Sequence, residues 1–228
     1  MPANTAKPKS SHKRLLIVDD HPMMRTGLAQ LIDNESGLKV CAEADNAGQA
    51  LDAIARQQFD LVLLDISLPD KNGLELIKDI QALKPGLPIL VVSMHDELLY
   101  AERVLRAGGR GYIMKQEGGK KITEAVRQVL DGRIYVSEKM SAKILEVFSG
   151  RGAEVAASPV EKLTDREFEV FQLIGQGLDT KPLAEKLHLS TKTIEVHRAN
   201  IKAKLNLKSM GELIRYAVRW AESQNTGA

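Results

Sequence analysis

The feature that most constrains the fold is a repeated alternation of short apolar runs with segments of helical periodicity over the first 130 residues. Such runs suit strands that are buried on both faces, and a strand followed by an amphipathic helix is the repeating unit of a parallel sheet. The alternation therefore predicts an α/β domain in which helices cover both faces of a doubly wound parallel sheet. The apolar runs are LLIV (15–18), KVCA (39–42), LVLL (61–64), PILVV (88–92) and GYIM (111–114).

This pattern ends after Gly132, and a chain of 228 residues suits two compact domains joined by a connector. The stretch SGRGAEVAASP (149–159) is rich in Gly, Ala and Ser and offers little to pack, which is typical of a linker. The predicted organisation is a disordered tail (1–12), an α/β domain (13–131), a linker with a helix (132–159) and a small all-α domain of four helices (160–228).

Composition restricts the cellular setting. No apolar run approaches the roughly 20 residues that a membrane helix needs, and the N-terminal residues lack the apolar core of a signal peptide. The only cysteine, Cys41, cannot form an internal disulfide, which fits a reducing compartment. We therefore expect a cytoplasmic protein that does not associate with a membrane.

Helix signals organise the second domain. Thr164 and Glu167 form the pattern of a capping box, Asp179 or Thr180 can cap the next helix, and Ser190 can cap a third. Glycines and the HLS turn separate the helical segments. The predicted helices run from Thr164 to the Gly175–Gly177 turn, from Thr180 to Leu187, from Thr191 to Leu205 and from Ser209 to Ala221.

Three acidic residues follow two of the apolar runs. Asp65 comes directly after LVLL, and Asp19 and Asp20 come directly after LLIV. With strand order 2-1-3-4-5, the first and third strands are neighbours, and their carboxyl ends open into the crevice where α/β sheets bind ligands. Like charges brought together must either take up protons or hold a cation, and oxygen ligands suit Mg²⁺. We expect the metal.

Two further strand ends carry polar residues, Ser93 after PILVV and Lys115 after GYIM. A hydroxyl, an ammonium and a divalent cation around a carboxylate form a receptor for a phosphoryl group, with Asp65 as the nucleophile. Each residue also has a simpler explanation. Asp19, Asp20 and Ser93 could cap helices, and Lys115 could be a solvated surface lysine.

Residues 13–131 resemble a response-regulator receiver domain, which has a flavodoxin-like (βα)5 fold. The matching segments are LLIVDDHP, LVLLDISLPDKNG, PILVVSMHD and GYIMKQ. The resemblance implies that Asp65 accepts a phosphoryl group from a sensor histidine kinase. It also implies that Asp20, Asp65 and the backbone carbonyl of Ser67 ligate Mg²⁺, and that Asp19 supports this metal site.

The same resemblance implies that Ser93 and Lys115 contact the phosphoryl group and that Ser93 and Tyr112 form a conformational switch. Packing of Tyr112 against the fourth helix is an equally good explanation of that aromatic residue. Aspartyl-phosphate phosphatases have a similar site, but they need a second acid two residues after the nucleophile, where this chain has Ser67. We therefore expect no enzyme activity beyond self-catalysed phosphotransfer and autodephosphorylation at Asp65.

The second domain is basic where the third helix is predicted. Residues 190–220 contain seven Lys or Arg but only two acids, Glu195 and Glu212. A short helix, a tight turn and a second helix have the form of a helix-turn-helix, although periodicity alone allows an ordinary helical hairpin or a protein-binding module.

The segment LTDREFEVFQLIGQGLDTKPLAEKLHLSTKTIEVHRANIKAKL resembles a LuxR-type DNA-binding domain along its whole length. That resemblance implies binding to double-stranded promoter DNA through the third helix. His197 has an alternative explanation as a half-buried core residue. The implied phosphate contacts are Thr193, His197, Arg198, Lys202 and Lys204. The implied base-facing residues are Lys192, Glu195, Val196 and Ala199.

The last predicted helix is more apolar than a small core requires. Leu213, Ile214, Ala217 and Val218 could form the contact of a homodimer that reads an inverted repeat, and core packing is the rival explanation. Taken together, the two resemblances predict a transcriptional response regulator of the NarL/FixJ type.

Overall fold

The computed structural model of the chain describes residues 12–148, 159–187 and 189–225. It divides into two compact units, Met1–Ala142 (the α/β unit) and Lys143–Ala228 (the helical unit). The predicted disordered tail, except for its last residue, and nearly all of the Gly/Ala/Ser-rich stretch lie outside the described residues. No helix in the described ranges is both long and apolar enough to cross a membrane.

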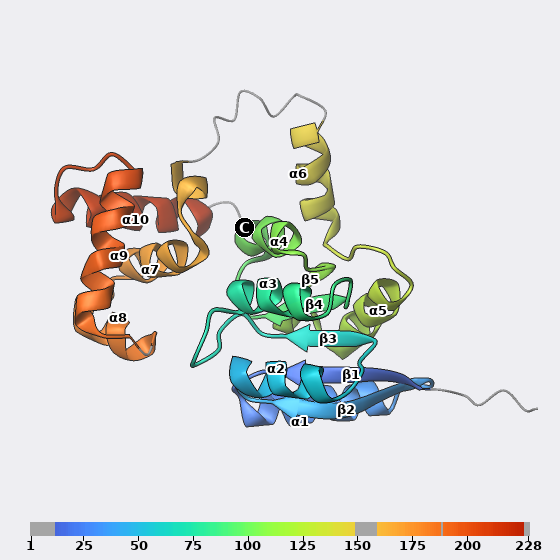
Figure 1. Cartoon of the computed structure of the whole chain (residues 1–228). Helices are drawn as coiled ribbons and strands as arrows, with labels where there is room; N and C mark the ends of the chain where they lie inside the picture. The colour runs from blue at the N-terminus through green and yellow to red at the C-terminus, as the bar shows by residue number, and fades with distance from the viewer. Residues whose placement is uncertain (1–11, 149–158, 188, 226–228) are drawn as a thin grey trace, which may run out of the picture. The chain divides into compact units, whose positions relative to one another are not determined.

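The α/β unit is built on a parallel sheet of five strands in the order β2-β1-β3-β4-β5 (Figure 1). This order confirms the prediction. The middle strands are buried on both faces, as their unbroken apolar sequences require. The strands are β1 (Lys13–Val18), β2 (Leu38–Ala44), β3 (Leu61–Leu64), β4 (Ile89–Ser93) and β5 (Gly111–Met114).

A helix follows each strand. Helices α1 and α5 contact each other and pack on the face lined by side chains such as Ile17 and Leu63. Helices α2, α3 and α4 contact one another in succession. The helices are α1 (Pro22–Asp33), α2 (Ala47–Arg56), α3 (Gly73–Leu83), α4 (Glu97–Ala107) and α5 (Gly119–Leu130), with a short 3₁₀ helix η1 (Lys115–Glu117) before α5.

Side-chain caps fix where several of these helices begin. Asn46 accepts the backbone N–H of Gln49 at the start of α2, and Asn72 accepts that of Leu74 at the start of α3. Asp96 caps α4 in the same way. Ser93 is therefore not the cap of α4, which removes that simpler explanation of its position.

After α5 the chain returns along the edge of the sheet. The N–H of Tyr112 donates to the carbonyl of Tyr135 (2.8 Å), and the N–H of Tyr135 donates to the carbonyl of Arg110 (3.1 Å). Glu97 then accepts the N–H of Ser137 at 2.7 Å. Helix α6 (Glu138–Phe148) follows, within the range predicted as a linker with a helix.

The helical unit has no strand among its described residues. After a 3₁₀ helix η2 (Pro159–Lys162) come α7 (Asp165–Gly175), α8 (Thr180–Lys186), α9 (Thr191–Lys204) and α10 (Met210–Asn225). The capping box of Thr164 and Glu167 is present. Asp179 occupies the N-cap position of α8, as predicted, but its side chain makes no capping hydrogen bond. Helix α10 continues to Asn225, beyond the predicted end.

The core of the helical unit corrects the predicted dimer surface. Trp220 of α10 lies edge-on to Phe168 and Phe171 of α7, with ring centroids 5.7 and 5.4 Å apart. Leu213 and Ala217 are fully buried in the same unit. An exposed dimer contact through these two residues is therefore wrong, because they belong to the core. Ile214 is 40% exposed and Val218 is half-buried, so these two residues remain on the surface.

Candidate functional site

The carboxyl ends of β1 and β3 place three acids together. Val18 and Leu64 are paired in the sheet, and the N–H of Asp65 donates to the carbonyl of Val18 at 2.8 Å. Asp19 and Asp65 therefore leave the sheet side by side and are buried, whereas Asp20 is partly exposed. The predicted convergence of the acids is confirmed.

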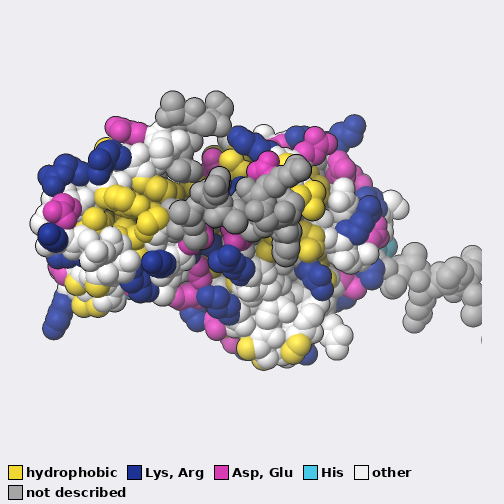
Figure 2. All heavy atoms as spheres, turned by 90° about the horizontal axis from the view of Figure 1, so that it is seen from above, with side chains coloured by type: hydrophobic (Ala, Val, Ile, Leu, Met, Phe, Trp, Pro, Cys, Tyr) yellow, Lys and Arg dark blue, Asp and Glu magenta, His cyan; other side chains and the backbone are white. Residues whose placement is uncertain are grey.

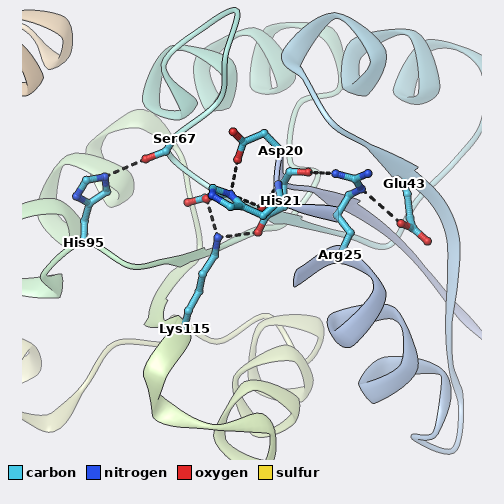
Figure 3. Close-up of polar contacts among 9 residues, drawn as sticks. Asp20, His21, Arg25, Glu43, Ser67, His95 and Lys115 are labelled. Carbon is cyan, nitrogen blue, oxygen red and sulfur yellow. Dashed lines mark hydrogen bonds and ion pairs between the residues drawn. The ribbon is translucent and has the colours of Figure 1, made fainter. Parts of the chain in front are cut away.

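Lys115 lies between two of these acids. Its Nζ is 2.7 Å from Oδ2 of Asp19 and 2.7 Å from Oδ2 of Asp65, and its side chain is only 3% exposed (Figure 3). The explanation of Lys115 as a solvated surface lysine is therefore wrong. Three ionised carboxylates and one ammonium leave the site with two negative charges, which a divalent cation would balance.

Burial and neighbouring charge set the protonation of this pair. Burial raises the pKa of Asp65 above its ordinary value; the Lys115 ammonium opposes this shift, and the Asp19 carboxylate adds to it. Burial alone would lower the pKa of Lys115, but the carboxylates of Asp65 and Asp19 outweigh burial and raise it. Lys115 therefore keeps a fixed positive charge beside the oxygen atoms of Asp65.

The acids fit a hard divalent cation. Oδ1 of Asp65 is buried and has no hydrogen-bond partner in the part of the chain that the structure describes. Carboxylate oxygens are the ligands that Mg²⁺ prefers. Ser67 forms a bridge with Asn72 across the loop after β3, and its Oγ lies 3.0 Å from Nε2 of His95. The role of the Ser67 carbonyl as a metal ligand stays a prediction.

Ser93 and Tyr112 meet the loop after β4. Ser93 is fully buried at the end of β4, and its Oγ accepts the N–H of His95 at 3.3 Å. The Tyr112 hydroxyl donates to the carbonyl of His95 at 2.8 Å, and the ring is fully buried where α4 contacts β5. Burial raises the pKa of Tyr112, so the hydroxyl keeps its proton. The loop is therefore held by both residues proposed as a switch.

Two residues that the sequence did not single out also contact this site. His21 Nδ1 lies 2.6 Å from Oδ1 of Asp20, and Arg25 Nη1 donates to the backbone carbonyl of Asp19 at 2.6 Å (Figure 3). Arg25 also lies 3.5 Å from Glu43 of β2. The signal for His21 was its position directly after the two acids, and Arg25 is one helical turn further along α1.

In the helical unit, α8 and α9 form the predicted helix-turn-helix. Helix α9 turns Ile194 and Ile201 into the core. The predicted base-facing residues all lie on the opposite, exposed face, with Val196 53% exposed. The exposed residues on this face of α9 are Lys192, Glu195, Val196 and Ala199.

The residues predicted to contact phosphates differ in how exposed their side chains are. Arg198 is only 7% exposed, and its guanidinium donates to Thr180 of α8. A phosphate contact by Arg198 is therefore wrong for this structure, because the side chain is used to join α8 to α9. Lys204 pairs with Glu167 at 2.6 Å. Thr193, His197 and Lys202 are half-buried, as the alternative explanation of His197 expects.

Both units match known families. Residues 15–127 match the response regulator receiver domain, and residues 161–217 match the bacterial regulatory proteins of the luxR family. The oxygen regulatory protein NreC of Staphylococcus carnosus is 34% identical over 210 residues, which cover 90% of this chain and 97% of that protein. NreC of Staphylococcus epidermidis (strain RP62A) is 35% identical over 211 residues, with the same coverage.

Solved structures agree with this assignment. A two-component response regulator of the LuxR family from Aurantimonas sp. SI85-9A1 is 32% identical with a TM-score of 0.57, over 61% of this chain and 99% of that chain. RcsB from Salmonella enterica serovar Typhimurium, bound to promoter rprA in the presence of BeF₃⁻, shares the fold at a TM-score of 0.61 and 24% identity, over 91% and 98% of the two chains. The chain therefore belongs to the two-component response regulators of the NarL/FixJ type, DNA-binding transcription regulators that join a receiver domain to a LuxR-type helix-turn-helix.

Proposed function

We propose that this transcription regulator is controlled by phosphorylation of Asp65 by a sensor histidine kinase and that phosphorylation alters its binding to promoter DNA. The observation that carries the proposal is the arrangement around Asp65. Its Oδ2 is paired with Lys115, whereas its buried Oδ1 has no hydrogen-bond partner among the described residues. One carboxylate oxygen is thus paired with an ammonium, and the other makes no hydrogen bond within the described residues.

In the proposed transfer, a carboxylate oxygen of Asp65 attacks phosphorus, an O–P bond forms, and the bond from phosphorus to the kinase histidine nitrogen breaks. Lys115 stabilises the negative phosphoryl oxygens, and Ser93 donates its hydroxyl to one of them. Asp19, Asp20, Asp65 and the Ser67 carbonyl would hold Mg²⁺, which when bound supplies positive charge next to the phosphoryl oxygens. No other enzyme activity is proposed, since the position of a second catalytic acid is Ser67.

The output would change through the loop after β4. When the Ser93 hydroxyl turns to the phosphoryl group, the His95 N–H loses its acceptor, and the Tyr112 hydroxyl bound to the His95 carbonyl is released to repack. This loop leads directly into the start of α4, so a change in the loop would reach a surface helix of the receiver. We propose that this shift favours a homodimer and frees α9.

The exposed face of α9 supports binding to the major groove of double-stranded DNA.

RcsB has been solved as dimers bound to DNA, and a paired arrangement would suit this chain as well. Figure 2 shows a hydrophobic patch bordered by basic side chains on the helical unit, on the left of that view. Ile214 and Val218 are the surface residues of α10 that we propose for the contact. The protein would act in the cytoplasm, where kinase and promoter meet.

The test compares the wild-type chain with Asp65→Asn after treatment with a small phosphodonor and Mg²⁺, using a genomic promoter library to measure DNA binding. We expect phosphorylation of the wild type to change its DNA affinity and Asp65→Asn to be neither labelled nor altered. Asp52→Asn is the matched control, because Asp52 is 75% exposed on α2. Equal DNA affinity of phosphorylated and unphosphorylated wild type would contradict the proposal.

A further inference from the structure

His21 is the N-cap residue of α1, but its side chain does not cap that helix. It makes no capping hydrogen bond to the backbone of α1. Instead its Nδ1 lies 2.6 Å from Oδ1 of Asp20 and 3.3 Å from Oδ1 of Asp19. The imidazole is therefore turned toward the acidic site, as the close-up shows (Figure 3).

The distances are short enough for one ion to reach all of these groups. One ligand atom from each of Asp19, Asp20, His21 and Asp65 lies within 4.8 Å of the others. A second observation points to a ligand here, since Asp65 is only 4% exposed and its Oδ1 has no hydrogen-bond partner among the described residues. A buried carboxylate oxygen in this state is costly unless a cation or a donor meets it.

We propose that His21 Nδ1 is a ligand of the cation at this site and that the site therefore prefers divalent transition metals over Mg²⁺. This inference rests on the proposed function, because the same acids hold the cation. Mg²⁺ is a hard ion that takes oxygen ligands, whereas imidazole nitrogen suits later transition metals such as Fe²⁺, Zn²⁺, Cu²⁺ and Ni²⁺. A site of three carboxylates and one imidazole offers these metals a ligand that Mg²⁺ uses poorly.

His95 provides a matched control within the same receiver. It is a second histidine near the site, but its Nε2 faces Ser67 Oγ at 3.0 Å and its ring lies 4.8 Å from that of Tyr100. It is not among the residues whose ligand atoms gather at the acids. Replacing His95 removes an imidazole near the site without removing the proposed ligand.

The direct test is pulsed electron paramagnetic resonance of Mn²⁺ bound to the metal-free, full-length chain. We expect echo modulation from a coordinated ¹⁴N nucleus in the wild type and in His95→Ala, and none in His21→Ala. Ni²⁺ affinity measured by calorimetry should fall about tenfold or more in His21→Ala, while Mg²⁺ affinity changes less than about twofold because oxygen ligands dominate its binding. Circular dichroism confirms that each variant is folded.

The outcomes separate this inference from the proposed function. A nitrogen signal that persists in His21→Ala, or equal Ni²⁺ affinities with normal Mg²⁺ binding, would overturn the role of His21 and leave the acidic site intact. If the wild type bound none of the three metals, both the His21 ligand and the proposed metal site would be wrong.

Discussion

The position of Asp65 depends on a residue that has no side chain. A Cβ on Gly73 would lie 2.6 Å from Cα of Ile66 and 2.7 Å from the carbonyl oxygen of Asp65. Gly73 is the first residue of α3, and its N–H donates to the carbonyl of Ile66 at 2.8 Å. The loop after β3 is thus packed directly against the start of this helix, with no room between the two backbones.

Gly73→Ala should therefore displace the backbone at Asp65. We expect a loss of about 1–3 kcal/mol in the free energy of unfolding and phosphorylation slowed by about tenfold, the result of a small misplacement of the nucleophile. Urea unfolding and a labelling time course measure the two effects. Gly27→Ala is the control, since no atom lies within 4 Å of a Cβ there; if both variants behaved like the wild type, the close packing would not constrain the site.

Lys115 should stabilise the metal-free protein as well as assist transfer. Lys115→Met leaves Asp19 and Asp65 buried together without their shared positive charge. In the presence of a chelator we expect unfolding free energy to fall by about 3 kcal/mol, and saturating Mg²⁺ should stabilise this variant more than the wild type. Calorimetry with chelator and with Mg²⁺ checks this, and an unchanged melting temperature in chelator would refute it.

The sequence predicted that the acids, Ser93 and Lys115 lie close together. The carboxyl ends of parallel strands meet at one edge of the sheet, so the residues that directly follow these strands meet there as well. The sequence could not predict which way a side chain turns. The ring of His21 faces the acids through a side-chain torsion. Arg198 is buried and donates a hydrogen bond to the hydroxyl of Thr180 on another helix. Both depend on three-dimensional neighbours that residue spacing does not specify.

Helices α7 and α9 are joined by a buried carboxylate. Glu167 accepts the N–H of Thr164 at 2.8 Å and pairs with Lys204 at 2.6 Å. Burial raises the pKa of Glu167, but the Lys204 and Thr164 hydrogen bonds outweigh it and lower that pKa below the ordinary 4.5. A carboxyl with a lowered pKa contributes stability that is present above about pH 4.5 and lost as pH falls through its folded-state pKa.

Glu167→Gln should accordingly lower the unfolding free energy of the helical unit by about 1–2 kcal/mol at pH 7, and this difference should shrink as pH falls below 4.5. Trp220, the only tryptophan, packs on Phe168 and Phe171 and reports this unit by fluorescence. Glu185→Gln, an exposed change on α8, is the control. A difference that is the same at pH 7 and pH 3.5 would rule out the ionised carboxylate as its source.

The segment that leads into α6 is tied to the receiver by α4. Glu97, 8% exposed, accepts the N–H of Ser137, two residues after Tyr135 has paired with β5. Glu97→Ala should speed hydrogen exchange of the Ser137 amide by about tenfold, equivalent to a lost hydrogen bond of about 1.4 kcal/mol. Exchange followed by NMR measures it. Glu102→Ala on the same helix should leave Ser137 unchanged, and an equal effect from both variants would count against the contact.

Elements were more predictable than contacts between them. Apolar runs located all five strands, and capping residues such as Thr164 and Ser190 located helix starts, because both signals are local. The edge pairing of Tyr135 with β5 carries no such local signal. The burial of Leu213 and Ala217 was also missed, since an apolar helical face looks the same whether it meets its own core or a second copy.

In the whole molecule, one carboxylate is proposed to receive the phosphoryl group that controls DNA binding. The residues proposed for these two tasks lie in separate units: the acids are at the strand ends of the receiver, and the exposed face of α9 is in the helical unit. The proposed change in DNA binding depends on phosphorylation of Asp65 at the acidic site of the receiver.

The most direct measurement is to treat the full chain with a small phosphodonor and Mg²⁺, reduce the product with borohydride, and locate the modified residue by mass spectrometry. Borohydride converts an aspartyl phosphate to homoserine. We expect conversion at position 65 alone, and none when the phosphodonor is omitted. Conversion at another acid, or a phosphoryl group on any other residue with Asp65 intact, would contradict it.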